Sequence, residues 1–200
     1  MPRRPPTSIH QIKVTLTETE PPIWRRLQVA SSINLRRLHD VLQVALGWTQ
    51  SHLYEFEIAG VTYGEPSTEY DWPTHRAKAT QLRRVAPEPG VTFRYLYDFG
   101  DSWRHELVVE RVMPPEPGVT YPRGVDGARS GPPEDVGGVV GYRDFLVVIA
   151  DPTDPEHEHL VSWSGGTFDP EACDLAAINA HLAHLGPSPW ATYDRMLAGR

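Results

Sequence analysis

The chain has 200 residues, a formal net charge of −7 and a hydrophobic content of 40%. This length and composition predict one globular domain and exclude an intrinsically disordered chain. The single cysteine, Cys173, excludes an internal disulfide and any zinc site made of several cysteines. Because no apolar run has the length of a membrane span and residues 1–10 lack the apolar core of a signal peptide, we expect a cytoplasmic protein without a membrane partner.

The N-terminal quarter of the chain predicts a hairpin followed by a helix. Residues 9–17 alternate apolar and polar side chains, as a half-buried strand does, and residues 23–29 predict the strand that pairs with it. Leucines then recur at helical spacing between Asn34, the expected N-cap, and Gly47, the expected stop. This helix has the most complete set of local signals in the chain.

The middle of the chain predicts two further pairs of strands. Residues 53–63 form the first pair, and residues 92–112 form two β-rich arms around a turn at 98–102. Residues 64–90 are polar and interrupted by prolines, so we expect mostly loop. Residues 113–138 hold six prolines and six glycines, and this density predicts no regular element.

The last third of the chain predicts helices. They are expected over residues 141–152, 155–163 and 168–186, with Asp169 as the N-cap of the third, and a short terminal helix is expected over 188–199. Strands that come first and helices that come later indicate the α+β class. We therefore predict a mainly antiparallel sheet on which the N-terminal helix and the C-terminal helical segment pack.

Five ordered segments resemble the plasmid pRiA ORF-three-like family, whose members are often labelled insertion-element passenger (TnpR-like) proteins: "PPIWRRLQV", "LRRLHDVLQVALGWTQSHLYEFEIAG", "YLYDFGDSWRHELVVE", "GPPEDVGGVVGYRDFL" and "FDPEACDLAAINAHL". The resemblance covers residues 8–185 and implies one domain there, with residues 186–200 as a C-terminal extension. It also implies a bacterial or archaeal protein with an α+β fold, and no established chemistry. No serine-recombinase pattern supports the resolvase-like label.

The resemblance also shows a departure at two cysteine positions. The family commonly carries cysteines where this chain has Gly124 and Gly131. Glycine offers no side chain to a metal or to a redox partner, so a site built on that pair is absent here. The adjacent "PPEDVGG" segment is intact, and a structural role for it is the simplest interpretation.

The segment "YDFGDSWRHEL" at residues 97–107 gathers acidic residues and a histidine at a predicted turn. In the structural interpretation, the short aspartate side chains at the hairpin tip accept hydrogen bonds from backbone amides of the turn. In the alternative interpretation the tip faces a cleft with the acidic pair of "PPED". Carboxylates suit divalent cations, and one histidine favours a transition metal. The catalytic candidates are Asp98, Asp101, His105, Glu134 and Asp135, and the first three are the metal candidates.

Two other groups of side chains are candidates for binding. His52 opens a predicted strand just after the helix and is a candidate pocket histidine near the hairpin. Residues 1–40 hold seven basic and three acidic residues, whereas residues 134–174 hold ten acidic residues and one arginine. The excess of acidic residues over 134–174 argues against broad nucleic-acid binding. The excess of basic residues over 1–40 leaves room for a local patch, whose candidate members are Arg25, Arg26, Arg36 and Arg37.

Three functions follow as hypotheses. The first is a non-catalytic binding or accessory module of mobile-element origin, with a protein partner. The second is a metal-assisted hydrolase acting on phosphate esters, which needs at least three of the five catalytic candidates around a common point. The third is a nucleic-acid-binding protein that uses the basic patch. No nucleotide-cofactor motif is present, and a divalent metal is the cofactor that the residue types allow.

Overall fold

The computed structural model describes residues 7–65 and 75–185. It holds an eight-stranded sheet in the order β5-β4-β3-β6-β7-β1-β2-β8, in which every neighbouring pair is antiparallel except β4 and β5. The strands are β1 (Ile9–Leu16), β2 (Ile23–Ala30), β3 (Tyr54–Ile58), β4 (Val61–Gly64), β5 (His75–Arg76), β6 (Thr92–Tyr97), β7 (Trp103–Met113) and β8 (Arg123–Ala128). The α+β class and the mainly antiparallel sheet are therefore confirmed.

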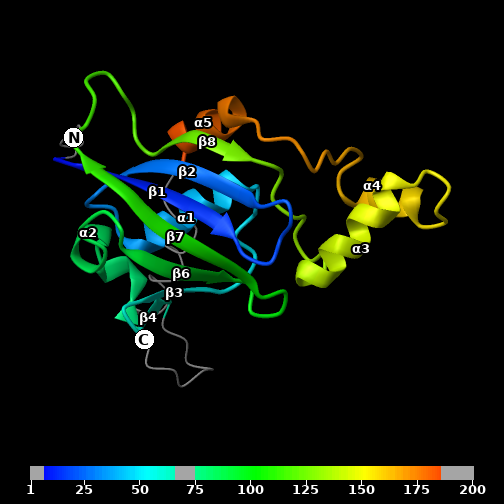
Figure 1. Cartoon of the computed structure of the whole chain (residues 1–200), viewed down its shortest axis with the longest axis horizontal. Coiled ribbons are helices and arrows are strands. Elements are labelled where there is room, and N and C mark those ends of the chain that lie inside the picture. The colour runs from blue at the N-terminus through cyan, green and yellow to red at the C-terminus, as the bar shows by residue number, and fades with distance from the viewer. Residues whose placement is uncertain (1–6, 66–74, 186–200) are drawn as a thin grey trace, which may run out of the picture.

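Helices lie against one face and beyond one end of the sheet (Figure 1). They are α1 (Leu35–Leu46), the 3-10 turn η1 (Ala77–Ala79), α2 (Leu82–Val85), α3 (Gly138–Ala150), α4 (His157–Trp163) and α5 (Leu175–Ala183). Helix α1 packs behind the central strands, and α5 contacts both β8 and α1. Helices α3 and α4 pack on each other past the end of the sheet. The terminal helix expected over 188–199, like the extension 186–200, lies outside the described residues.

Helix α1 forms where its local signals place it. The Asn34 side chain accepts a hydrogen bond from the Arg37 backbone N–H at 2.8 Å, and Gly47 ends the helix with φ of 84°. Its leucines are fully buried against the apolar face of the sheet, in one core with residues such as Ile12 and Phe56. This rigid unit fixes the position of the segment that follows it, which carries His52.

Two C-terminal elements differ from the sequence prediction. Strand β8 forms inside the segment expected to lack regular structure, because its backbone pairs with β2. Helix α5 begins at Leu175 rather than near Asp169, and its N-cap is Asp174, which accepts a hydrogen bond from the Ala177 N–H at 2.9 Å. Residues 169–172 instead form a turn to which Ser130 donates hydrogen bonds.

Candidate functional site

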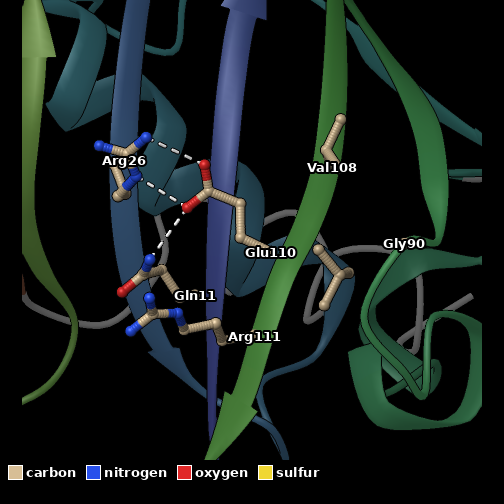
Figure 2. Close-up of a pocket in the computed structure, with 7 residues that line it drawn as sticks. Gln11, Arg26, Gly90, Val108, Glu110 and Arg111 are labelled. Carbon is tan, nitrogen blue, oxygen red and sulfur yellow. Dashed lines mark hydrogen bonds and ion pairs between the residues drawn. The ribbon is translucent and has the colours of Figure 1, made fainter.

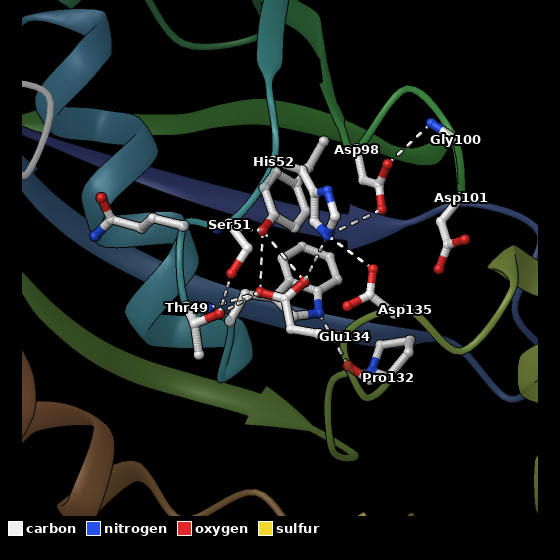
Figure 3. A network of polar contacts seen from close by, with 12 residues as sticks. Thr49, Ser51, His52, Asp98, Gly100, Asp101, Pro132, Glu134 and Asp135 are labelled. Carbon is white, nitrogen blue, oxygen red and sulfur yellow. Dashed lines mark hydrogen bonds and ion pairs between the residues drawn. The ribbon is translucent and has the colours of Figure 1, made fainter. Parts of the chain in front are cut away.

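The turn between β6 and β7 positions Asp98 by its own backbone. Asp98 has φ of 56°, and its Oδ1 accepts a hydrogen bond from the Gly100 N–H at 2.9 Å. This contact is the turn-closing role that short acceptors play at hairpin tips. The second oxygen, Oδ2, points toward His52, at 3.5 Å from the His52 Nε2 atom (Figure 3). Asp98 therefore closes the turn with one oxygen and offers the other to a site.

The loop before α3 brings Glu134 to the same place. Trp48, just past the end of α1, donates a hydrogen bond from Nε1 to the Pro132 carbonyl at 2.9 Å. The Glu134 carboxylate accepts hydrogen bonds from the Thr49 N–H at 2.7 Å and from the Tyr97 hydroxyl at 3.0 Å. Burial, followed by the nearby Glu134 charge, raises the pKa of Tyr97, so this hydroxyl stays a hydrogen-bond donor at neutral pH. These contacts fasten the loop to the end of α1 and to β6.

His52 Nε2 is the point on which three carboxylates converge. It lies 3.0 Å from Asp135 Oδ1, 3.5 Å from Asp98 Oδ2 and 4.0 Å from Glu134 Oε2 (Figure 3). The nitrogen is buried, yet it has no hydrogen-bond partner among the described residues, so the oxygen at 3.0 Å lies off the axis of a hydrogen bond. His52, Asp98 and Asp135 offer ligand atoms that all lie within 4.8 Å of one another.

The site is sheltered on one side and open on the other. Asp98 is buried, the His52 side chain is 28% exposed, and the Asp135 side chain is 68% exposed. The His52 ring also packs edge-to-face on Tyr97, with 5.9 Å between the ring centroids. The histidine and Asp98 are thus held by the fold, while Asp135 faces solvent.

The structure separates the remaining two acid–base candidates from this cluster. Asp101 Oδ2 accepts a hydrogen bond from the Gly137 N–H at 3.1 Å, so it ties the hairpin to the start of α3. His105 is 1% exposed and lies in the core, where burial lowers its pKa to about 4. The expectation that His105 faces the cleft is corrected: it lies on the same face of β7 as Trp103, which is buried.

The four arginines do not gather into an exposed patch. Arg25 lies on the buried face of β2, and Arg36 is buried in an ion pair with Glu65. Arg26, on the opposite face of β2, is paired with Glu110 at 2.7 Å (Figure 2) and with Asp126 at 2.6 Å. Arg37 is paired with Asp40 at 3.1 Å. The expected basic patch is therefore corrected, since these guanidinium groups are engaged within the fold.

The two glycines at family cysteine positions have different surroundings. Gly124 lies in β8, where its N–H donates to the Asn179 side chain at 2.7 Å and an added Cβ would meet ordinary contacts beginning at 3.4 Å. At Gly131, an added Cβ would lie 2.0 Å from the Leu46 carbonyl oxygen. A cysteine at position 131 therefore requires the loop to move away from the end of α1.

Comparison with known proteins identifies the family. The sequence matches the family described as "Plasmid pRiA4b ORF-3-like protein" over residues 8–177. The chain belongs to this family. It is 39% identical over 186 residues to "Uncharacterized protein y4hQ" of Sinorhizobium fredii (strain NBRC 101917 / NGR234), covering 92% of this chain and 95% of the relative.

A solved structure shares the fold of this pRiA4b ORF-3-like chain. The "Crystal Structure of Protein of Unknown Function MM3350 from Methanosarcina mazei Go1" superposes with a TM-score of 0.77 at 32% identity. The match covers 86% of this chain and 98% of that one. Among the described helices, none has the length and apolar character needed to cross a membrane.

Proposed function

We propose that this pRiA4b ORF-3-like chain is a binding or accessory module whose ligand is a divalent transition-metal cation. The proposal depends on one observation: a buried imidazole nitrogen with no hydrogen-bond partner among the described residues lies amid carboxylate oxygens. One imidazole and two carboxylates form a mixed nitrogen and oxygen ligand set, which suits Mn²⁺, Fe²⁺ or Zn²⁺ better than Ca²⁺. His52 Nε2, Asp98 Oδ2 and Asp135 Oδ1 would be the ligands.

The surrounding contacts support the assignment of roles. Asp98 is already oriented by its bond to Gly100, as metal-ligating carboxylates commonly are by outer contacts. Glu134 is engaged with Thr49 and Tyr97, so its role is to hold the loop and add negative charge beside the ion. Because Asp135 is exposed, a bound ion keeps coordination positions that face solvent. Such positions would admit water or a carboxylate of a partner protein.

Calorimetric titration of the metal-free protein with MnCl₂ and ZnCl₂ tests this proposal. We expect one ion per chain, and we expect His52→Ala to weaken its affinity by at least about tenfold, since loss of a supporting contact alone costs that much at metal sites. The imidazole of His52 is partly exposed, so this change leaves the core intact. His159→Ala, at a solvent-exposed position on α4, is the matched control. Equal affinities for His52→Ala and the unaltered protein would contradict the ligand assignment.

A metal-assisted hydrolase of phosphate esters is the second candidate. Asp98, Glu134 and Asp135 all lie within 4.0 Å of His52 Nε2, which meets the requirement for three of the five catalytic candidates around one point. A bound cation at such a point would activate water near neutral pH. His52, and not the predicted His105, supplies the imidazole at this point.

Hydrolysis of bis(4-nitrophenyl) phosphate with saturating Mn²⁺ separates the two candidates. A hydrolase would release nitrophenol in the unaltered protein, and the rate would fall to the metal-only background in Asp98→Asn. Asp98→Asn keeps the shape of the side chain and an oxygen for the Gly100 amide. If both proteins release nitrophenol only at the background rate but bind the metal, the hydrolase hypothesis is rejected and the binding-module hypothesis stands.

A further inference from the structure

A second candidate site lies beside residues 130–133, which directly precede the loop residues Glu134 and Asp135. There, an open cavity of about 410 Å³ is lined by the C-terminal end of α1, by α5 and by residues 130–133. This volume is within the range of small-molecule sites. Arg25 reaches it from β2 and is only 3% exposed. The cavity therefore combines a buried positive charge with enough space for a ligand.

Main-chain carbonyls fix the Arg25 guanidinium and leave one nitrogen free. Nε donates to the Ala45 carbonyl at 2.8 Å, and Nη1 donates to the carbonyls of Trp24 and Ala128, both at 2.9 Å. Nη2 makes no hydrogen bond within the described part of the chain. The group is thus held rigidly through Nε and Nη1, and the two N–H donors of Nη2 remain available to an acceptor.

No carboxylate neutralises this arginine within residues 7–65 and 75–185. The ion pairs found there engage six other arginines, whereas Arg25 has no carboxylate oxygen within 4.0 Å; the six are Arg26, Arg36, Arg37, Arg94, Arg123 and Arg129. Burial lowers the pKa of Arg25, and only the neighbouring Cys173 opposes this effect. Buried charges in proteins are generally paired, because an isolated charge loses its hydration without compensation. The charge of Arg25 is therefore compensated only by main-chain carbonyls within the described residues, and an anion at Nη2 would balance it.

The walls of the cavity indicate what kind of anion fits. Most of the lining is apolar, and its larger side chains are Val44, Leu46, Pro133, Phe168 and Ile178. The acidic member, Asp174, is turned to its own helix, where it caps the Ala177 N–H. His181 adds a polar group, and the hydroxyls of Ser130 and Ser164 donate to main-chain carbonyls. A single guanidinium in apolar surroundings matches a monoanion with an apolar body better than it matches a phosphate dianion.

We propose that this cavity binds a small organic carboxylate, with the carboxylate on Arg25 Nη2 and the apolar body against α1 and α5. The ligand would sit between three elements that are distant in sequence, namely β2, α5 and the loop 130–133. Charge-assisted bonds from arginine to carboxylate are about twice as strong as neutral ones, so charge should dominate selectivity. The proposal does not depend on the metal site.

NMR-monitored titration with hexanoate and with hexanamide tests the proposal, because the two probes match in size and differ in charge. We expect hexanoate to shift resonances of Ile178 and His181 and to bind at least about tenfold more tightly than hexanamide. Inorganic phosphate, the third probe, should bind more weakly than hexanoate. Comparable affinities for hexanoate and hexanamide, or no shift with hexanoate, would overturn the proposal, and tighter phosphate binding would overturn the ligand class.

Two variants localise the binding. Ala177 lines the cavity yet is exposed, so Ala177→Trp fills the cavity without removing a core contact and should abolish the hexanoate shifts. Arg25→Met should remove the preference for hexanoate over hexanamide. If Arg25→Met does not fold, Ala177→Trp and the probe pair still decide the outcome. His52→Ala is the control and should bind hexanoate as the unaltered protein does. Unchanged hexanoate affinity in Ala177→Trp would show that hexanoate does not bind in this cavity.

Discussion

Acidification from pH 6.5 to pH 4 is expected to lower the free energy of unfolding by at least about 3 kcal/mol. His105 is 1% exposed, and burial lowers its pKa to about 4, although hydrogen bonds to the backbone of Tyr95 and Trp103 act in the other direction. The unfolded chain takes up this proton from about pH 6.5 downward, while the folded chain resists it until about pH 4. The stabilisation is therefore complete above pH 6.5 and is lost between these two values.

Two more buried histidines add to the loss of unfolding free energy at low pH. Burial, followed by the charge of Arg36, holds the pKa of His39 well below its ordinary value, and burial also lowers the pKa of His10. His39 is fixed by a hydrogen bond with the Tyr95 hydroxyl and stacks on the Tyr54 ring at 3.7 Å. His10 is bonded to Ser31 and to the Ala86 carbonyl. None of these rings can accept a proton without disturbing a packed, hydrogen-bonded neighbourhood.

Urea unfolding at pH 7 and at pH 4 measures the effect. His105→Phe keeps an aromatic ring beside Trp48 but cannot titrate, so the difference in unfolding free energy between the two pH values should shrink by about 3 kcal/mol. His159→Gln, at an exposed position, should leave that difference unchanged. A pH dependence that is the same in His105→Phe and in the unaltered chain would show that His105 does not carry it.

The parts of the fold that sequence predicts well are those with local causes. The cap at Asn34 and the stop at Gly47 lie directly beside the helix that they define. Strand β8 and the start of α5 have tertiary causes. At Gly127, an added Cβ would lie 2.9 Å from Arg25 Cδ, Cys173 Sγ and the Trp24 carbonyl. A glycine there is read as a loop signal from sequence, but it permits the close approach of β8 to its neighbours.

Sequence predicts which residues belong to the candidate site better than it predicts how they are arranged. The sequence alone indicates the hairpin tip, the "PPED" acids and His52 as candidates. The Trp48–Pro132 contact, which brings the loop to the end of α1, joins residues 84 apart in sequence, so sequence does not predict it. Strand alternation predicts that His105 lies on the same buried face of β7 as Trp103. Its nearness in sequence to Asp101 suggests a shared site instead, and this suggestion is wrong. The carboxylate partners of Arg26 and Arg36 cannot be predicted from sequence, because they come from distant strands and loops.

Replacing Glu65 by leucine is expected to lower the free energy of unfolding by about 3–5 kcal/mol, the usual cost of breaking a buried ion pair from one side. The side chains of Arg36 and Glu65 are only 5% and 6% exposed. The Glu65 carboxylate accepts two hydrogen bonds from the guanidinium and a third, at 2.9 Å, from the Tyr54 hydroxyl. Glu65→Leu removes the buried carboxylate that accepts these hydrogen bonds from the Arg36 guanidinium and the Tyr54 hydroxyl.

Urea unfolding of the single and the double variant separates the cost of burying a charge from the cost of lost packing. Arg36→Met/Glu65→Leu removes both charges, so it should recover about 2 kcal/mol relative to Glu65→Leu alone. Glu57→Leu breaks the exposed contact with Arg94 and should cost under about 1 kcal/mol. If Glu65→Leu were as mild as Glu57→Leu, the pair would not be desolvated. If the double variant were no more stable than Glu65→Leu, the loss of stability would come from packing and from the lost Tyr54 hydrogen bond. The buried charges would then not account for the coupling of α1 to the end of β4.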